Sequence, residues 1–141
     1  MRLSVFVADT ISTQLTIDLQ KIYLNERPEA SLTALALSDE LQKKSSLLYV
    51  TMFNERHIGA VKVSKKETRA VLSELCIREI TRRRGIGKNL LRQVEKALFA
   101  DGISSIEYDF TEVQQQQSLS TQAFLSDSGY SIDGHIATKQ L

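Results

Sequence analysis

The residues best suited to chemistry lie in one stretch, Leu75–Leu91, with the sequence LCIREITRRRGIGKNLL. An apolar segment leads into a turn rich in arginine and glycine, and an amphipathic segment follows. The first N–H groups of a helix have no intrahelical partner, and the helix dipole adds partial positive charge at that end. A basic glycine turn that opens a helix therefore predicts an anion site, and phosphate or pyrophosphate suits it best.

Arg82, Gly85 and Gly87 form an R-x-x-G-x-G pattern whose spacing excludes two common phosphate motifs. A dinucleotide fingerprint would have its third glycine at Leu90. A Walker A loop would have Ser or Thr at Asn89, and another glycine five residues before its Gly-Lys pair. The alternative that the residues alone leave open is a solvated arginine run before an ordinary amphipathic helix.

The pattern resembles the acyl-CoA loop of the GNAT (Gcn5-related N-acetyltransferase) superfamily, where [Q/R]-x-x-G-x-[G/A] follows the fourth strand and opens the third helix. This resemblance implies an α/β GNAT (acyl-CoA N-acyltransferase) fold, with a mixed, mostly antiparallel sheet flanked by helices. It implies acetyl-CoA or CoA as cofactor, with the pyrophosphate on the turn and the pantetheine paired to the preceding strand. The cofactor-binding residues implied are Leu75, Cys76, Ile77, Arg82, Arg83, Arg84, Gly85, Ile86, Gly87, Lys88 and Asn89.

Three stretches resemble a narrower GNAT group, the PanZ (or PanM) maturation factors of aspartate 1-decarboxylase. They are Ile17–Ile22, Phe53–Arg56 and Arg78–Gly87, the last with Glu79 and Arg83 where most GNAT loops carry proline and glycine. Members of this group bind acetyl-CoA or CoA and, in that state, bind the decarboxylase proenzyme. Binding promotes self-cleavage of the proenzyme and lets CoA levels regulate pantothenate synthesis.

The resemblance implies the aspartate 1-decarboxylase proenzyme as partner, with Asn54 and Arg78 in the stretches that face it. Arg78 suits a carboxylate because its guanidinium is planar and bidentate. The alternative for this pair is a turn asparagine and an ordinary surface arginine. Two other functions remain open: an N-acetyltransferase acting on a small amine or a protein amine, and a CoA-binding domain with a different partner.

No catalytic residue is predicted. Acetyltransferases of this superfamily commonly return a proton through a tyrosine four residues before the glycine of a G-[FY] pair. Here that pair is Gly129-Tyr130, so the position holds Leu125, which cannot donate a proton. Tyr108 and Tyr130 are expected to be core or sheet aromatics.

The remaining ionisable residues are expected to have structural or solvated roles. His57 and His135 fall near turns and are expected to be exposed, without metal or triad partners. Cys76 is expected to be an inert core thiol. The candidate bases are strand carboxylates that are expected to be solvated: Glu74, Glu107 and Asp109.

Apolar periodicity predicts the elements that must position these residues. Alternation predicts strands over 2–8, 47–53, 57–63, 69–80 and 103–110. The residues Asn54–Arg56 connect the second and third strands in an antiparallel hairpin. Helical spacing predicts a first helix capped by Ser12 or Thr13, with Leu15, Leu19, Ile22 and Tyr23 on its apolar face. The next predicted helix has an apolar stripe made of Ile86, Leu90, Val94 and Ala97, widened by Leu91 and Leu98.

Residues that end helices, polar segments and turn residues complete the predicted order of elements. Pro28 ends the first helix, and residues 31–42 form one short helix or a loop. Asp101-Gly102 ends the second helix. The glutamines Gln114–Gln117 predict a flexible loop, since they bury nothing, and Ser118–Ser126 a short helix that ends at Gly129. Asp133-Gly134 predicts a hairpin turn between two short final strands.

Composition fits one domain that binds a single anionic ligand. The 141 residues are expected to form a single GNAT domain over 1–141. Lys and Arg number 18 against 17 Asp and Glu, so the net charge of +1 does not attract nucleic acid or membrane. One cysteine excludes a disulfide framework. No apolar run approaches the ~18 residues of a membrane helix, and the first residues lack a signal-peptide layout, so a cytoplasmic protein is expected.

Overall fold

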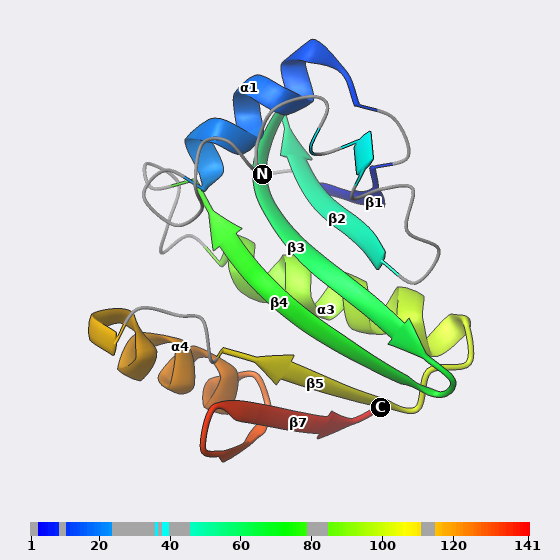
Figure 1. The fold of residues 1–141 in the computed structure, drawn as a ribbon, viewed down its shortest axis with the longest axis vertical. Coiled ribbons are helices and arrows are strands. Elements are labelled where there is room, and N and C mark those ends of the chain that lie inside the picture. The colour runs from blue at the N-terminus through cyan, green and yellow to red at the C-terminus, as the bar shows by residue number, and fades with distance from the viewer. Residues whose placement is uncertain are drawn as a thin grey trace.

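The computed structural model describes residues 3–8, 11–23, 36, 38–39, 46–78, 85–110 and 115–141. Within these ranges the chain forms a mixed sheet with helices on its faces (Figure 1). The helices are α1 (Thr13–Ile22), α3 (Ile86–Ala100) and α4 (Gln115–Asp127). The strands are β1 (Ser4–Val7), β2 (Ser46–Phe53), β3 (Arg56–Lys66), β4 (Arg69–Ile77), β5 (Ser105–Asp109), β6 (Ser131–Asp133) and β7 (Ile136–Gln140).

The strands of the described sheet follow the order β1-β2-β3-β4-β5-β7-β6. Neighbouring strands are antiparallel except at the centre, where β4 and β5 are parallel. The chain makes this parallel connection by crossing over the sheet through α3, because parallel neighbours cannot be joined by a tight turn. The α/β class and the mostly antiparallel mixed sheet predicted from the sequence are confirmed.

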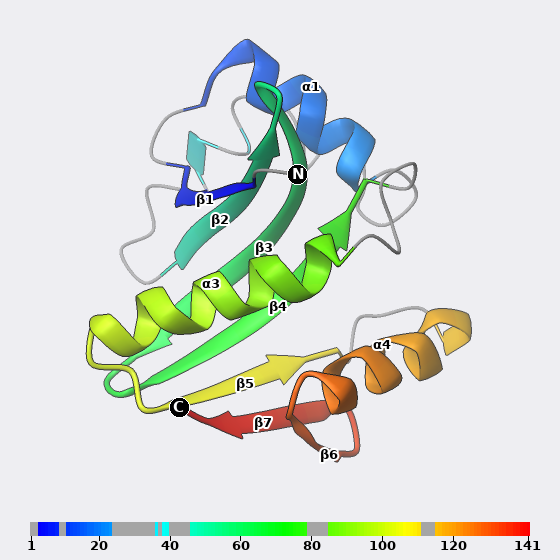
Figure 2. The same ribbon diagram turned by 180° about the vertical axis from the view of Figure 1, so that it is seen from behind.

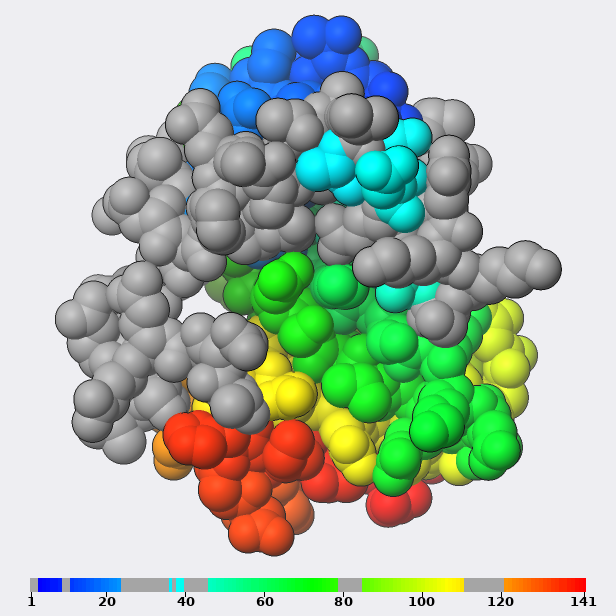
Figure 3. All heavy atoms as spheres, in the orientation of Figure 1, coloured from blue at the N-terminus to red at the C-terminus, as the bar shows by residue number. Residues whose placement is uncertain are grey.

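The core divides between the two faces of the sheet. Successive strand residues point to opposite faces, so Tyr49 packs on one side and its neighbours Leu48 and Val50 on the other. The helix α1 covers the Leu48 side and α3 the Tyr49 side, and the two views show these helices on opposite faces (Figures 1 and 2). In the space-filling view α1 covers only the upper part of its face, and side chains of β4 and β5 reach the surface below it (Figure 3).

The predicted apolar stripes account for both helices. In α1 the side-chain oxygen of Ser12 accepts from the backbone N–H of Leu15 at 3.0 Å, which confirms Ser12 as the N-cap. In α3 the buried residues are Ile86, Leu90, Leu91, Val94 and Leu98. This helix ends at Asp101, and Gly102 follows it at φ 91°.

The two predicted hairpins are present. The β2–β3 turn is Asn54–Glu55, and both residues have left-handed backbones, at φ 51° and 66°. Two positive φ values are the requirement of a type I′ turn, which matches the twist of the paired strands. The final hairpin joins β6 to β7 through Gly134 and His135.

The expected flexible loop over Gln114–Gln117 is wrong for Gln115–Gln117, which form the first turn of α4. Four glutamines argue against an apolar face, but glutamine is a good helix former, and its helix propensity favours the helical turn observed here. Residue 114 lies outside the described residues, as do Pro28 and most of the predicted helix or loop over 31–42. No helix in the described part of the chain is long and apolar enough to span a membrane.

Replacing Leu90 by alanine should lower the free energy of unfolding by about 2–5 kcal/mol, because it leaves a cavity in the fully buried layer between α3 and the sheet. The measurement is urea denaturation followed by circular dichroism. The matched control is Phe99→Ala in the same helix, since Phe99 is 63% exposed. Equal losses for the two variants would contradict this account of the core.

Candidate functional site

Within the described ranges, the first backbone N–H groups of α3 have no hydrogen-bond partner. Its N-cap is Gly85, at φ 76° and ψ 7°, and Gly85 makes no side-chain cap hydrogen bond. The first intrahelical bond runs from the N–H of Asn89 to the carbonyl of Gly85, at 3.0 Å. The N–H groups of the three residues between them are therefore available to an anion. Gly85 and Lys88 are exposed, Gly87 and Asn89 are half-buried, and Ile86 is buried.

Glycine at position 85 is required by conformation rather than by space. Its φ of 76° lies in the left-handed region that side chains disfavour, while an added Cβ would meet nothing within 4 Å. The arginines of the predicted turn, Arg82, Arg83 and Arg84, lie outside the described residues, as do residues 79–81. Their role as phosphate ligands stays a prediction.

The predicted ligand strand is the part of β4 that leaves its parallel neighbour. The β4–β5 ladder pairs Arg69–Leu72 with Ser105–Tyr108 and has no further pairs along the described strands. β4 continues to Ile77, and the two ribbons diverge beyond the ladder (Figure 1). Glu74 marks the divergence with a left-handed φ of 55°. Beyond it, Leu75 and Ile77 are half-buried and Cys76 is buried.

The structure brings this strand end and the start of α3 together. A methyl group added at Gly87 would lie 3.6 Å from Cγ1 of Ile77 and 3.4 Å from the ring of Phe124. The first turn of α3 therefore packs directly beside the last residue of β4, with α4 on its other side. The backbone of Leu75–Ile77 and the free N–H groups after Gly85 can face one extended ligand that carries a phosphate group.

Two tyrosine hydroxyls hold the backbone where β4 leaves β5. The N–H of Leu75 donates to the hydroxyl of Tyr108 at 2.9 Å, and the hydroxyl of Tyr23 donates to the carbonyl of Glu74 at 2.6 Å. The predicted burial of Tyr108 is confirmed, but sequence reasoning missed this second role. Because the Leu75 N–H already has a partner, a ligand that pairs along β4 must displace Tyr108 there or begin its pairing further along the strand.

The residues considered as catalytic acids or nucleophiles either have other hydrogen-bond partners or are deeply buried. Leu125 is fully buried. The Tyr130 hydroxyl donates to Oε2 of Glu95 at 2.7 Å, and burial together with this carboxylate raises the pKa of Tyr130. Cys76 is buried as predicted, and its thiol donates to the carbonyl of Ile22 at 3.0 Å.

The carboxylates predicted to be solvated differ in exposure. Glu74 is exposed, while Glu107 and Asp109 are half-buried, and Glu107 pairs with Arg69 at 3.1 Å. His135 is exposed as predicted. Among the described residues, no group of three or more His, Cys, Asp or Glu side chains is arranged to hold a metal ion.

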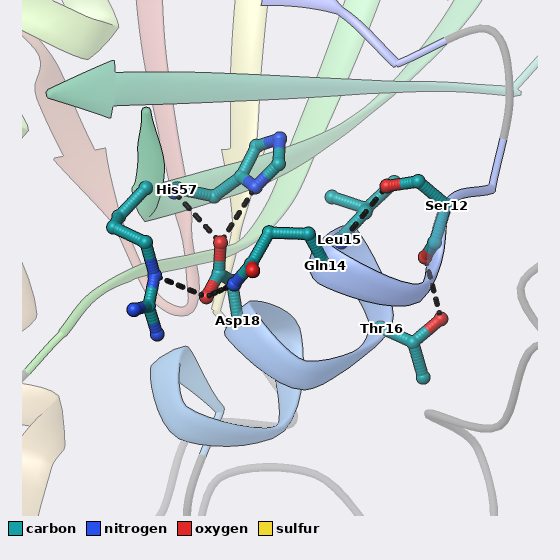
Figure 4. A network of polar contacts seen from close by, with 7 residues as sticks. Ser12, Gln14, Leu15, Thr16, Asp18 and His57 are labelled. Carbon is teal, nitrogen blue, oxygen red and sulfur yellow. Dashed lines mark hydrogen bonds and ion pairs between the residues drawn. The ribbon is translucent and has the colours of Figure 1, made fainter. Parts of the chain in front are cut away.

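The predicted exposure of His57 is wrong, since its side chain is only 8% exposed. Its ring Nδ1 lies 2.8 Å from Oδ2 of Asp18, and its backbone N–H donates to the same oxygen at 2.9 Å (Figure 4). On the other side the ring packs against Phe6, with centroids 6.2 Å apart. The sequence position of Asp18 could have indicated this contact. Asp18 is at i+3 from Leu15 and so lies on the apolar stripe of α1, where a carboxylate requires hydrogen-bond partners.

Burial raises the pKa of Asp18, but the hydrogen bonds that it accepts outweigh burial and leave the pKa below its ordinary value of 3.8. Those bonds come, in order of effect, from the His57 backbone, the His57 ring, Gln14 and Arg56. The carboxylate therefore stays ionised inside the protein at neutral pH, held by four donors.

The two predicted partner residues lie at the same end of the sheet. Asn54 is exposed in the β2–β3 turn. Arg78 is half-buried just after β4, and its backbone N–H donates to the carbonyl of Ile58 at 2.7 Å. This bond aligns Arg78 with a residue close to the start of β3, which follows the turn. The described geometry thus places Arg78 beside the strand that follows the Asn54 turn.

Comparison with known proteins agrees with this architecture. The family described as acetyltransferase (GNAT) domain, PanZ, matches residues 2–137. The PanD regulatory factor of Escherichia coli K12 is 39% identical over 94 residues, which cover 67% of this chain and 67% of that protein. The PanD regulatory factor of Salmonella typhimurium LT2 is 40% identical over the same length and shares.

Solved structures give the same fold. The solution structure of YhhK from E. coli, bound to coenzyme A, is 30% identical, with a TM-score of 0.78 and full coverage of both chains. The PaiA N-acetyltransferase of Thermoplasma acidophilum, in complex with coenzyme A, is 19% identical, with a TM-score of 0.76 and full coverage of both chains. At that identity the second likeness shows the fold alone.

The free energy that the Asp18 carboxylate contributes should depend on acid pH. A carboxylate with a lowered pKa in the folded state stabilises the protein above its unfolded pKa, and this contribution is lost as the pH falls through the folded pKa. We expect Asp18→Asn to cost about 1–3 kcal/mol at neutral pH. The difference from wild type should shrink as the pH falls below 3.8. Urea unfolding of both proteins at several pH values measures this, and a difference that does not change down to about pH 2.5 would contradict it.

Proposed function

The chain belongs to the PanZ family of GNAT acetyltransferase domains, and from this premise we propose that it binds coenzyme A or acetyl-CoA and, in that state, promotes self-cleavage of the aspartate 1-decarboxylase proenzyme. Through the availability of CoA it would then tune pantothenate synthesis. The name of its curated relatives, PanD regulatory factor, supports a role in regulating the decarboxylase. The coenzyme A in the YhhK structure supports the ligand.

One observation supports the CoA site above the others: the start of α3 packs beside the part of β4 that extends beyond its ladder with β5. CoA has a pyrophosphate that suits helix N–H groups and a pantetheine chain whose amides can pair with a strand edge. The proposed ligand residues along this path are Leu75, Cys76 and Ile77 on β4, and Gly85, Ile86, Gly87, Lys88 and Asn89 at the start of α3. Arg82, Arg83 and Arg84 are proposed from the sequence motif alone.

For the proenzyme, we propose the end of the sheet that carries Asn54 and Arg78. Asn54 is exposed at a turn, and the side chain of Arg56 beside it is 43% exposed. A surface with guanidinium groups suits carboxylates on a partner. The last residue of β4 lies beside the proposed CoA site, and Arg78 is the next residue in the chain. Ligand and partner would therefore contact neighbouring residues of one short segment.

An N-acetyltransferase activity has less support from the described residues. The position of the usual acid is Leu125, which lies fully inside the core, so a hydroxyl cannot be introduced there without repacking. The Tyr130 hydroxyl is directed to Glu95. A transfer reaction would need its acid from a residue that the superfamily does not commonly use.

Replacing Gly85 by valine should weaken CoA binding by about 1–3 kcal/mol, or about 5- to 150-fold. Valine resists the left-handed backbone that aims the first N–H groups of α3. The matched control is Gly102→Val, since Gly102 has a φ of 91° and equally open surroundings but lies at the far end of the same helix. Titration calorimetry should show lost affinity only for Gly85→Val. Wild-type protein that does not bind CoA would refute the ligand assignment.

Added protein should accelerate cleavage of the decarboxylase proenzyme, and it should do so only when CoA or acetyl-CoA is present. Cleavage is followed on a denaturing gel, and complex formation on a sizing column. Release of free thiol from acetyl-CoA, measured with a panel of amines, should stay at background. An unchanged cleavage rate with no complex would refute the partner, whereas rapid amine-dependent thiol release would favour an enzyme.

A further inference from the structure

Asp18 is a fully buried carboxylate that four donors satisfy (Figure 4). Gln14 Nε2 donates to Oδ1 at 2.7 Å, and Arg56 Nε to the same oxygen at 3.2 Å. The backbone N–H of His57 donates to Oδ2 at 2.9 Å, and Nδ1 of its ring lies 2.8 Å from that oxygen. A buried charge is costly without such partners, so the groups around it have little freedom to move apart.

The donors come from two elements. Gln14 is on α1, four residues before Asp18, and its bond stays within the helix. Arg56 and His57 are the first two residues of β3 and directly follow the Asn54–Glu55 turn. Three of the four hydrogen bonds therefore tie α1 to the hairpin, at the point where the chain leaves its turn.

That turn has a conformation that its sequence does not favour. Both central residues are left-handed, and neither is glycine. Asparagine tolerates this region, but for glutamate the left-handed backbone costs roughly 1–2 kcal/mol, so an Asn-Glu turn is less secure than the Asn-Gly turn typical of such hairpins. The side chain of Glu55 is exposed. The bonds to Asp18 supply a restraint from outside the turn.

We propose that Asp18 is a positioning residue for the partner surface: it holds the start of β3 so that the strained turn presents Asn54 in one orientation. The inference rests on the proposed function, because it assigns Asn54 to the decarboxylase proenzyme. Asp18 itself is buried and cannot touch a partner. Its effect on binding is therefore indirect and passes through Arg56 and His57.

The test measures affinity for the proenzyme in the presence of CoA, and affinity for CoA alone, in matched variants. Asp18→Asn should weaken proenzyme binding at least about tenfold, since an amide nitrogen would face the His57 or Arg56 donors, while its CoA affinity stays within about twofold. Gln14→Ala removes only the donor on α1 itself, so both affinities should stay within about twofold. Equal proenzyme affinity in Asp18→Asn and wild type would overturn the proposal.

A rescue variant separates positioning from general destabilisation. Glu55→Gly creates an Asn-Gly turn that adopts the left-handed conformation without strain. Measured against Glu55→Gly alone, the combination of Glu55→Gly with Asp18→Asn should lose much less proenzyme affinity than Asp18→Asn loses against wild type. An equal loss in the two backgrounds would overturn the proposal.

One measurement needs no variant and covers the case in which Asp18→Asn does not fold. The backbone N–H of His57 donates to a buried carboxylate, so its hydrogen exchange should be nearly as slow as that of core strand amides. Exchange as fast as that of exposed loops would show that the restraint is absent and overturn the proposal. Wild-type protein that does not bind the proenzyme in any condition refutes the proposed function instead.

Discussion

The candidate site depends on where the parallel pairing of β4 with β5 stops. The ladder spans four residue pairs, and β4 then continues without this neighbour. Backbone N–H and C=O groups that lose a strand partner need others, because leaving them unpaired is costly. At the point of departure the two tyrosine hydroxyls of Tyr23 and Tyr108 fill this need. Both tyrosines are almost fully buried, so the local geometry is held from inside the core rather than by solvent.

The helix α1 makes hydrogen bonds near both of the proposed sites, the CoA site and the partner surface. Near its middle, Asp18 accepts hydrogen bonds from the start of β3. At its carboxyl end, the carbonyl of Ile22 accepts from the Cys76 thiol, and the Tyr23 hydroxyl donates to Glu74. A shift of β4 would therefore act on the same short helix that restrains the β2–β3 turn. Coupling between the proposed ligand and the proposed partner would require an element that both sites bias, and α1 has contacts near both proposed sites.

The sequence allows much of the fold to be predicted, because periodicity and turn chemistry act locally. The stripe of α3, the Ser12 cap and the alternation of Ile106 with Tyr108 all follow from neighbouring residues. The loop predicted at Gln115–Gln117 is wrong because a low content of apolar residues does not exclude a helix. The R-x-x-G-x-G spacing, together with the strand pattern before it and the helix pattern after it, predicts an anion site at the start of α3, and this site stays a prediction.

The contacts that the sequence does not reveal are those between residues far apart in the chain. His57 lies near a turn, as an exposed histidine would, and its burial depends on a carboxylate 39 residues away. Tyr108 occupies an alternating strand position typical of a core aromatic. Nothing in its neighbouring residues indicates that its hydroxyl accepts a hydrogen bond from Leu75, 33 residues away. Such pairings can be predicted only once the strand register and the position of the helix are known. Only then can the partners of Asp18, a polar residue on an apolar stripe, be identified.

The same long-range contacts bear on the choice between a regulator and an enzyme. An acyltransferase must release and return protons beside its bound thioester, so it needs a hydroxyl or another acid that is free to act there. Near the end of β4, the Tyr23 hydroxyl is bonded to Glu74 and the Tyr108 hydroxyl to Leu75, while the thiol of Cys76 is directed at the helix backbone. These polar groups fix the shape of the strand. Among the residues that the structure describes here, these hydrogen bonds favour the proposed role as a CoA-binding regulator over acyl transfer.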